Sequence, residues 1–102
     1  MDVPTSEVEL SVVVPVLNGV GTLAELHGRL SATLEQCCQS HEIVIVDDGS
    51  RDGTWQLVGE LTHRDPSMRG LRLARNSGHA AAVAAGFSVS RGAIVAMIDV
   101  DL

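Results

Sequence analysis

The sequence predicts an α/β fold with a mostly parallel sheet, and three observations lead to this prediction. Short runs of β-branched residues alternate along the chain with longer stretches that have helical periodicity. The first two of these runs are almost continuously apolar, which is typical of parallel strands that are covered on both faces. The chain has 102 residues, of which 45% are hydrophobic and 20% are charged, and this suits one small domain.

Four strands and three helices are expected, in strict alternation. The strands are predicted at residues 10–14, 42–46, 70–73 and 93–98, and the helices at residues 22–37, 53–63 and 78–89. Pro15 is expected to end the first strand, because proline has no N–H to contribute to a sheet. Thr22 and Glu25 match the capping-box pattern at the start of the first helix. The third helix is rich in alanine and glycine, whose small side chains allow a helix to approach a sheet closely.

Polar residues follow each predicted strand at its carboxyl end. Asn18 follows the first strand, Asp47 and Asp48 the second, Arg75 and Asn76 the third, and Asp99 and Asp101 the fourth. In parallel α/β sheets, ligands bind outside the carboxyl ends of the strands, near the point where the strand order reverses. We therefore expect these four clusters, which are distant in the chain, to converge on one crevice.

The last polar cluster suggests a metal site. Asp99 and Asp101 are separated by one residue, so in a continuing strand both carboxylates project to the same side. Two carboxylates this close repel each other unless a cation lies between them, and hard divalent ions such as Mg²⁺ or Mn²⁺ prefer such ligands. The alternative is a pair of solvated loop acids.

The other clusters are suited to recognising a nucleotide. Asp47 and Asp48 are expected at the rim of the sheet, because burying an unpaired carboxylate is costly, and there they accept hydrogen bonds from a base or a ribose. The alternative is that residues 47–50 only shape the turn. Arg75 is suited to pairing with phosphate or stacking on a base, or else to a surface ion pair. Residues 76–78 either cap the third helix or expose its first N–H groups to phosphate.

Composition narrows the class of partner and the expected location. The net charge is −6, all seven basic residues are arginine, and the absence of a basic patch argues against a nucleic-acid partner. No apolar run approaches the roughly 20 residues that span a bilayer. Three of the first nine residues are acidic and none is basic, which is the wrong sign of charge for a secretory signal, so we expect a cytoplasmic location. Cys37 and Cys38 lack CxxC spacing and are expected to be packing residues at a helix end.

Four segments, in order, resemble the family 2 glycosyltransferases: residues 11–18, 45–54, 74–78 and 98–102. The likeness is to the polyprenyl-phosphate glycosyltransferases of the dolichol-phosphate mannose synthase type, and it covers the chain from Leu10 onward. It implies a three-layer α/β/α, Rossmann-like GT-A fold, of which residues 10–102 form the nucleotide-sugar-binding half, truncated after the DxD strand. Residues 1–9 are then an N-terminal tail.

The resemblance also implies ligands and the residues that bind them. The donor is a UDP- or GDP-linked sugar, and the acceptor is a lipid phosphate, such as a polyprenyl phosphate, or a saccharide. Asp48 is expected to bind the base, while Asp99 and Asp101 hold Mg²⁺ or Mn²⁺ on the diphosphate. The residues implied to bind the nucleotide sugar are Pro15, Val16, Leu17, Asn18, Asp47, Asp48, Gly49, Ser50, Arg75, Asn76, Gly78, His79, Asp99, Val100 and Asp101.

Three features depart from the family pattern. Leu17 and Gly19 stand where the family usually has an aromatic residue and a glutamate, and His79 stands where a basic residue is common. The family's chain also continues past the DxD motif, where its acceptor site and any membrane helices lie. We therefore expect this chain to be marginally stable and inactive alone, and a full-length relative to be membrane-associated. Residues 93–98 would form an exposed apolar edge that is open to self-association.

Two other functions fit parts of the sequence. Residues 19–24 match the G-x-G-x-x-A pattern of dinucleotide-binding domains. However, residues 15–18 separate the strand from these glycines, and the DxD motif has no role in such a domain. The other alternative is a catalytically inactive remnant that binds nucleotide weakly, or that pairs with a partner through the fourth strand.

Overall fold

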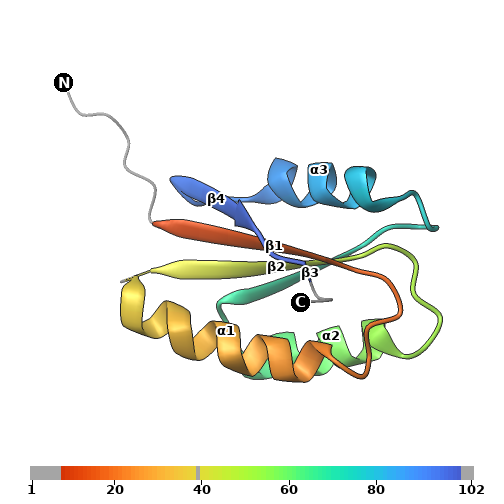
Figure 1. Ribbon diagram of the computed structural model, residues 1–102, viewed down its shortest axis with the longest axis horizontal. Coiled ribbons are helices and arrows are strands. Elements are labelled where there is room, and N and C mark those ends of the chain that lie inside the picture. The colour runs from red at the N-terminus through yellow and green to blue at the C-terminus, as the bar shows by residue number, and fades with distance from the viewer. Residues whose placement is uncertain (1–7, 39, 100–102) are drawn as a thin grey trace.

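The computed structural model describes residues 8–38 and 40–99, which form one sheet and three helices (Figure 1). The elements are β1 (Leu10–Val16), α1 (Leu23–Cys37), β2 (His41–Asp47), α2 (Thr54–Arg64), β3 (Met68–Arg72), α3 (His79–Val89) and β4 (Ile94–Met97). All strand pairs among these residues are parallel, and the strand order is β3-β2-β1-β4. The α/β fold predicted from the sequence is thus confirmed.

The helices cover both faces of the sheet. Helices α1 and α2 lie on one face and α3 on the other (Figure 1). The chain proceeds from β1 to β3 in one direction and then returns to the opposite side of β1 to form β4. Connections of one hand therefore place α3 on the face opposite to α1 and α2. The order reverses between β1 and β4, and this is the point where α/β sheets usually bind ligands.

The two central strands carry the core. In both β1 and β2 every residue after the first is buried. Successive side chains point to opposite faces, so Val12 and Val14 pack against the layer of α1 and α2, whereas Val13 packs against α3 with Val46 and Ala82. The near-continuous apolar runs in the sequence are therefore explained by burial on both faces.

Helix α3 lies very close to the sheet, as its small residues predict. Ala82 is fully buried. A Cβ built on Gly86 would stand 3.0 Å from Cγ2 of Val46 and would collide with the side chain of Val13. The tight packing of α3 therefore requires a residue without a side chain at this position.

Two local predictions are wrong. Pro15 does not end β1, because it pairs with Val46 in register and the strand continues to Val16. The Val16 carbonyl accepts a hydrogen bond from Asp48 and the Val13 carbonyl accepts one from Ile98. Because backbone groups alternate along a strand, the missing N–H of Pro15 faces the side of β4, whose ladder has already ended at Val13.

The predicted capping box is also absent. Helix α1 begins at Leu23, and Thr22 makes no side-chain cap with the helix. Its hydroxyl instead points back toward the Gly19 carbonyl, at 3.4 Å. The backbone N–H groups of Thr22 and Leu23 bond to the same carbonyl, so a tight turn takes the place of the cap. Strand β3 also begins two residues before the predicted range and ends one residue before its end.

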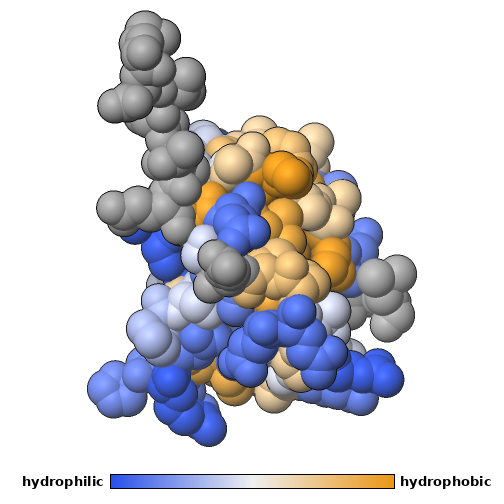
Figure 2. All heavy atoms as spheres, turned by 90° about the vertical axis from the view of Figure 1, so that its left-hand side faces the viewer, coloured by the Kyte–Doolittle hydropathy of each residue, from blue (hydrophilic) through white to orange (hydrophobic). Residues whose placement is uncertain are grey.

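The outer edge of the sheet at β4 is apolar and exposed. Ile94 is 66% exposed, and Val95, Met97 and the neighbouring Phe87 of α3 are also exposed. Figure 2 shows apolar side chains gathered on the upper part of the face that carries β4 and the end of α3, above a hydrophilic lower part. The exposed edge is as expected, and the self-association that it favours remains a prediction.

The remaining expectations concern the N-terminal tail, the two cysteines and membrane-spanning helices. Most of the predicted tail, residues 1–9, lies outside them, although the carbonyls of Val8 and Glu9 accept hydrogen bonds from Ala93 and Ile94. Cys37 and Cys38 are free thiols at the end of α1, and Cys38 packs against the core. No helix within residues 8–38 and 40–99 is long and apolar enough to cross a membrane.

Candidate functional site

A cavity opens at the carboxyl ends of the strands, beside the point where the strand order reverses. Its volume is about 390 Å³. The ends of β1 and β2, the loop after β3, the start of α3 and the residues after β4 all contribute to it. Its lining consists of Pro15, Val16, Leu17, Asp48, Asn76, Gly78, His79, Ala82 and Asp99. We call this space the first cavity.

A second cavity of about 390 Å³ adjoins the first and shares Leu17 and Asn76 with it. The rest of its lining comes from the loops after β1, β2 and β3 and consists of Asn18, Gly49, Ser50, Arg51, Arg72, Leu73, Ala74 and Arg75. Of the candidate residues that the structure describes, only Asp47 lines neither cavity. Val100 and Asp101 lie outside the described residues.

Asp48 connects the first cavity to the loop that precedes α3. Its carboxylate accepts hydrogen bonds from the backbone N–H groups of Ser77 (2.7 Å) and Gly78 (3.0 Å). Asp48 is only 4% exposed, so these two bonds compensate for much of the cost of burying its charge. The same carboxylate therefore lines the cavity and holds the loop that forms one of its walls.

The turn after β2 touches this loop as well. Gly49 has a φ of +85°, a conformation that favours glycine. A Cβ on Gly49 would lie 2.7 Å from the nitrogen of Asn76 and 2.9 Å from the carbonyl carbon of Arg75. Gly49 thus allows the β2 turn and the β3 loop to meet backbone against backbone.

Asp47 lines neither cavity, and the expectation that its carboxylate lies at the rim is wrong. It is completely buried, and its Oδ1 accepts a hydrogen bond from the Ser50 N–H at 2.9 Å. Among the described residues its Oδ2 has no hydrogen-bond partner, and the guanidinium Nε of Arg72 stands 3.9 Å away. That guanidinium also lies over the ring of Trp55. Asp47 therefore shapes the turn, which is the alternative that the sequence left open.

The loop after β1 is fastened to the turn after β2. Asn18 has a positive φ of 54°, its N–H donates to the Ser50 hydroxyl at 2.7 Å, and its Oδ1 accepts from the Arg51 N–H at 2.9 Å. The Gly19 N–H donates to the Thr54 hydroxyl at the start of α2. Asn18 and Ser50, both expected to bind ligand, are thus also the groups that hold two loops together.

Asp52 secures the next part of the same turn. Its carboxylate accepts hydrogen bonds from the hydroxyl and the N–H of Thr54 and from the N–H of Val20. The bond from the Thr54 hydroxyl is the main reason that the pKa of Asp52 lies below its usual value. The carboxylate is therefore ionised at neutral pH and joins the start of α2 to the β1 loop.

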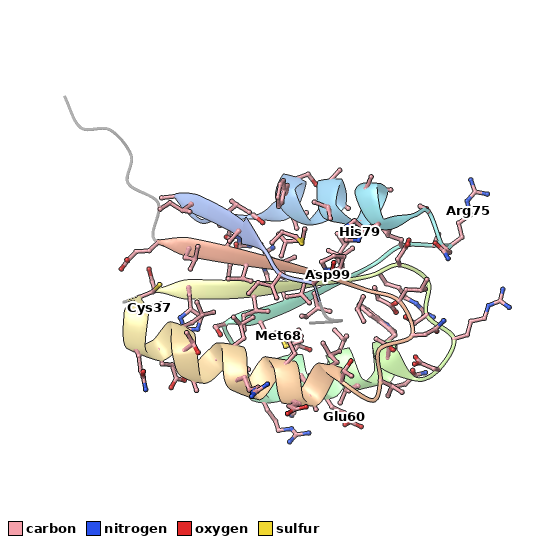
Figure 3. The ribbon with its side chains drawn as sticks, viewed as in Figure 1. Cys37, Glu60, Met68, Arg75, His79 and Asp99 are labelled. Atoms are coloured by element: carbon pink, nitrogen blue, oxygen red, sulfur yellow. The ribbon has the colours of Figure 1, made fainter. Side chains whose placement is uncertain are left out.

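The remaining candidates differ in how they face the first cavity. His79 at the start of α3 and Asp99 beyond β4 both line it, whereas Arg75 extends outward from the molecule (Figure 3). Asp99 is exposed, so its carboxylate is accessible to a ligand. Within residues 8–38 and 40–99, no group of three or more His, Cys, Asp or Glu side chains is placed to hold a metal ion.

Arg51 and Arg72 line the second cavity, although the sequence did not single them out. Arg72 is the last residue of β3, and the predicted strand placed it inside the range 70–73. Its position at the end of the strand depends on a register with β2 in which Arg72 pairs with Asp47. An arginine near the end of a short, weakly alternating run is the signal that could have marked it.

Comparisons with known proteins identify what the chain resembles. The family model described as "Glycosyl transferase family 2" matches residues 11–102. Over 94 residues, which are 91% of the chain, it is 38% identical to the undecaprenyl-phosphate 4-deoxy-4-formamido-L-arabinose transferase of Aeromonas hydrophila. Over the same share it is 44% identical to the transferase of that name from Pseudomonas aeruginosa. It covers only 29% and 28% of these relatives.

Solved structures agree with this match. S. aureus TarS 1–349 in complex with UDP-GlcNAc is 29% identical and superposes with a TM-score of 0.75, over 91% of this chain and 26% of that one. The mannosyltransferase PcManGT from Pyrobaculum calidifontis, in complex with GDP-Man and Mn²⁺, is 26% identical with a TM-score of 0.77. That superposition covers 97% of this chain and 30% of the mannosyltransferase.

Proposed function

Because this chain belongs to glycosyltransferase family 2, we propose that it is the donor-binding part of an enzyme that transfers a glycosyl group from a nucleotide sugar to a polyprenyl phosphate. One observation carries the proposal most strongly. The first cavity is lined by residues from all four strand ends and lies where the order of the GT-A sheet reverses. The relatives named above supply the acceptor class, since their names specify undecaprenyl phosphate.

The lining of the first cavity suits a nucleotide. Its volume of about 390 Å³ lies within the range of small-molecule pockets. Leu17 offers an exposed apolar surface on which a base can rest, with Pro15 and Val16 beneath it in the lining, while Asp48 and Asn76 add hydrogen-bonding groups beside it. A pocket with an apolar floor and a few fixed polar groups is typical of cofactor and nucleotide sites.

Asp99 and Asp101 are the residues that would hold Mg²⁺ or Mn²⁺. Asp99 is an exposed carboxylate at the cavity, and hard divalent ions bind through one or two carboxylates together with ligand phosphates. The Asp99 carboxylate therefore suits such an ion. Because the chain has a net charge of −6, a bound cation would also reduce the electrostatic repulsion of an anionic nucleotide sugar. When bound, the ion supplies Lewis-acid stabilisation of the leaving nucleoside diphosphate.

A polyprenyl-phosphate acceptor does not need a general base from the protein to activate its nucleophilic oxygen. A phosphate monoester has a second pKa near 6, so at neutral pH its oxygen is already ionised. That oxygen forms a bond to the anomeric carbon of the sugar as the bond from this carbon to the diphosphate oxygen breaks. We therefore propose that the residues described here orient the donor and that none of them acts as the base.

The positions of the glycines argue against the alternative that the chain is a dinucleotide-binding domain. Neither Gly19 nor Gly21 lines the first or the second cavity. Strand β1 continues to Val16, so the glycines do not follow it directly as the tight phosphate-binding turn requires.

Calorimetric titration of the 102-residue chain tests the proposal. Titrants are UDP- and GDP-linked sugars, each with Mn²⁺ and each with a chelator, and NAD serves as a comparison. We expect at least one nucleotide sugar to bind in a metal-dependent manner, and Asp99→Asn to abolish that binding. The matched control is Glu60→Gln, because Glu60 lies on α2 away from both cavities, in an exposed pair with Arg64. Uptake of NAD with no uptake of any nucleotide sugar or Mn²⁺ would refute the proposal.

A further inference from the structure

A buried polar cluster lies at the opposite end of the sheet from the two cavities. Its centre is Glu42, the second residue of β2, which is only 5% exposed. The Glu42 carboxylate accepts hydrogen bonds from the Ser11 hydroxyl (2.5 Å), the Arg91 N–H (2.6 Å) and Nε of Arg69 (2.9 Å). Three strands and the connection after α3 therefore meet at one carboxylate.

The partners of Glu42 extend the cluster along that connection. The Arg69 guanidinium also donates to the Val89 carbonyl at 2.5 Å, and the Ser11 hydroxyl accepts from the Gly92 N–H at 2.7 Å. The connection from α3 to β4 is thus held at residues 89, 91 and 92 by side chains of β1, β2 and β3. We call Ser11, Glu42 and Arg69 the clamp.

The backbone at Gly92 packs directly against Ser11 of the clamp, with no room for a side chain. A Cβ on Gly92 would lie 2.5 Å from the nitrogen and 2.7 Å from the hydroxyl oxygen of Ser11. Two residues later β4 begins, with Ile94 paired to Leu10 and Val95 paired to Ser11. The clamp therefore fixes the chain immediately before the register of β4 is established.

Strand β4 has few other contacts that could establish its register. It is four residues long, its side chains are mostly exposed, and within the described residues it pairs only with β1. A slip of one residue would turn every side chain of the strand to the other face. It would also displace Asp99, which follows the strand by two residues and lines the first cavity. The strand has little of the burial that specifies register in β1 and β2, and only Ile98, directly after it, packs against the main core cluster.

We propose that Glu42, together with Ser11 and Arg69, is a positioning residue that sets the register of β4 and so presents Asp99 to the first cavity. A buried carboxylate is penalised unless its hydrogen bonds are made, so a shifted β4 would leave Glu42 without the Arg91 N–H and Ser11 without the Gly92 N–H. The native register of β4 is the one in which all of these hydrogen bonds are formed. The link to ligand binding rests on the proposed function, whereas the register of β4 does not.

Residue-resolved amide hydrogen exchange tests the proposal in the intact chain. Ser11→Ala removes the hydroxyl that bridges Glu42 and Gly92, and Glu42→Gln removes the charge at nearly constant volume. The Ile98 amide, which donates to Val13, reports on β4, and the Ile43 amide, which donates to Ser67, reports on the rest of the sheet. We expect protection at Ile98 to fall by about tenfold in Ser11→Ala while protection at Ile43 changes little.

Ser31→Ala is the matched control, because the buried Ser31 hydroxyl has no hydrogen-bond partner within the described part of the chain. It should leave exchange at Ile98 unchanged. Mn²⁺ titration, with the metal as the probe, should show weaker binding in Ser11→Ala and unaltered binding in Ser31→Ala. Equal losses of protection at Ile98 and Ile43, or no loss at either, would overturn the proposal. If wild-type protein takes up no Mn²⁺, the proposed function fails, and the exchange data alone still decide the role of the clamp.

Discussion

Gly49 approaches Asn76 so closely that a Cβ built on it would stand 2.7 Å from the Asn76 nitrogen. This contact joins the turn after β2 to the loop after β3, and Asn76 lines both cavities. The geometry of the candidate site therefore depends on a backbone contact that only glycine permits.

Replacing Gly49 by alanine should destabilise the protein more than replacing Gly53. Both glycines have a positive φ, of 85° and 95°, so both substitutions introduce backbone strain of about 1–2 kcal/mol. Nothing lies within 4 Å of a Cβ on Gly53, whereas a Cβ on Gly49 collides with backbone atoms. We expect the free energy of unfolding to fall by about 1–3 kcal/mol more in Gly49→Ala. Urea denaturation measures the free energy of unfolding of both variants. Equal losses would contradict the prediction, because they would mean that the backbone collision at Gly49 is relieved at no cost.

Two glycines inside helices should respond to alanine in opposite directions. Gly59 of α2 is exposed, with nothing within 4 Å of a Cβ, so Gly59→Ala should stabilise the protein by about 0.5–1 kcal/mol. Gly86 of α3 faces Val13 and Val46, so Gly86→Ala should destabilise it by about 1–3 kcal/mol. Thermal denaturation of the pair checks this. Stabilisation by Gly86→Ala would contradict the close packing of α3.

Asp48→Asn should loosen the loop before α3. An asparagine keeps one carbonyl oxygen but presents its NH₂ group to the other backbone donor, so the N–H of Ser77 or Gly78 loses its partner at a cost of about 1–3 kcal/mol. We expect faster amide exchange at both positions and weaker binding of the nucleotide sugar. Asp52→Asn is the control, because Asp52 bonds to Thr54 and Val20 instead. If exchange at Ser77 and Gly78 is unchanged in Asp48→Asn, Asp48 does not hold the loop.

Acid should destabilise the protein in part through Glu42. Burial alone raises the pKa of this carboxyl, but hydrogen bonds from Ser11, the Arg91 N–H and Arg69 outweigh it, and the pKa lies below its ordinary value. A lowered pKa in the folded state means that the carboxylate contributes stability above its unfolded pKa of about 4.3, and that this is lost as the pH falls through the folded value.

Glu42→Gln should therefore be less stable than wild type at pH 7, and the difference should shrink as the pH falls below about 4. Urea denaturation from pH 3 to pH 7 measures this. Glu60→Gln, which alters an exposed pair, should follow the wild-type profile. A constant difference between wild type and Glu42→Gln across this range would contradict the assignment.

Some features of the site could be predicted because they depend on local pattern and on the geometry of parallel sheets. Asp48 and Asp99 follow apolar runs 51 residues apart in the chain, yet both line the first cavity. Parallel strands have their carboxyl ends at one edge, so the order of elements suffices to bring these residues together. The small residues of α3 likewise predicted its close approach to the sheet, because that depends on side-chain size alone.

Other features had no local pattern to reveal them. Asp47 and Asp48 are adjacent acids, and only the packing of β2 against its neighbours buries the first in the turn and turns the second to the cavity. Pro15 is tolerated inside β1 because its missing N–H faces a ladder that has already ended, which depends on the length of β4. The capping box at Thr22 was displaced by a turn around Gly19.

Periodicity and strand direction are properties of neighbouring residues, so the order of amino acids was enough to predict the α/β fold, the alternation of its elements and the edge of the sheet at which polar groups collect. Which side chains face the cavities and which hold loops together depends on the packing of the layers and became visible in the structure alone. The same packing brings Ser11, Glu42 and Arg69 together around residues 89–92. Such contacts join segments that lie 20 or more residues apart, and their geometry is settled by how the layers pack.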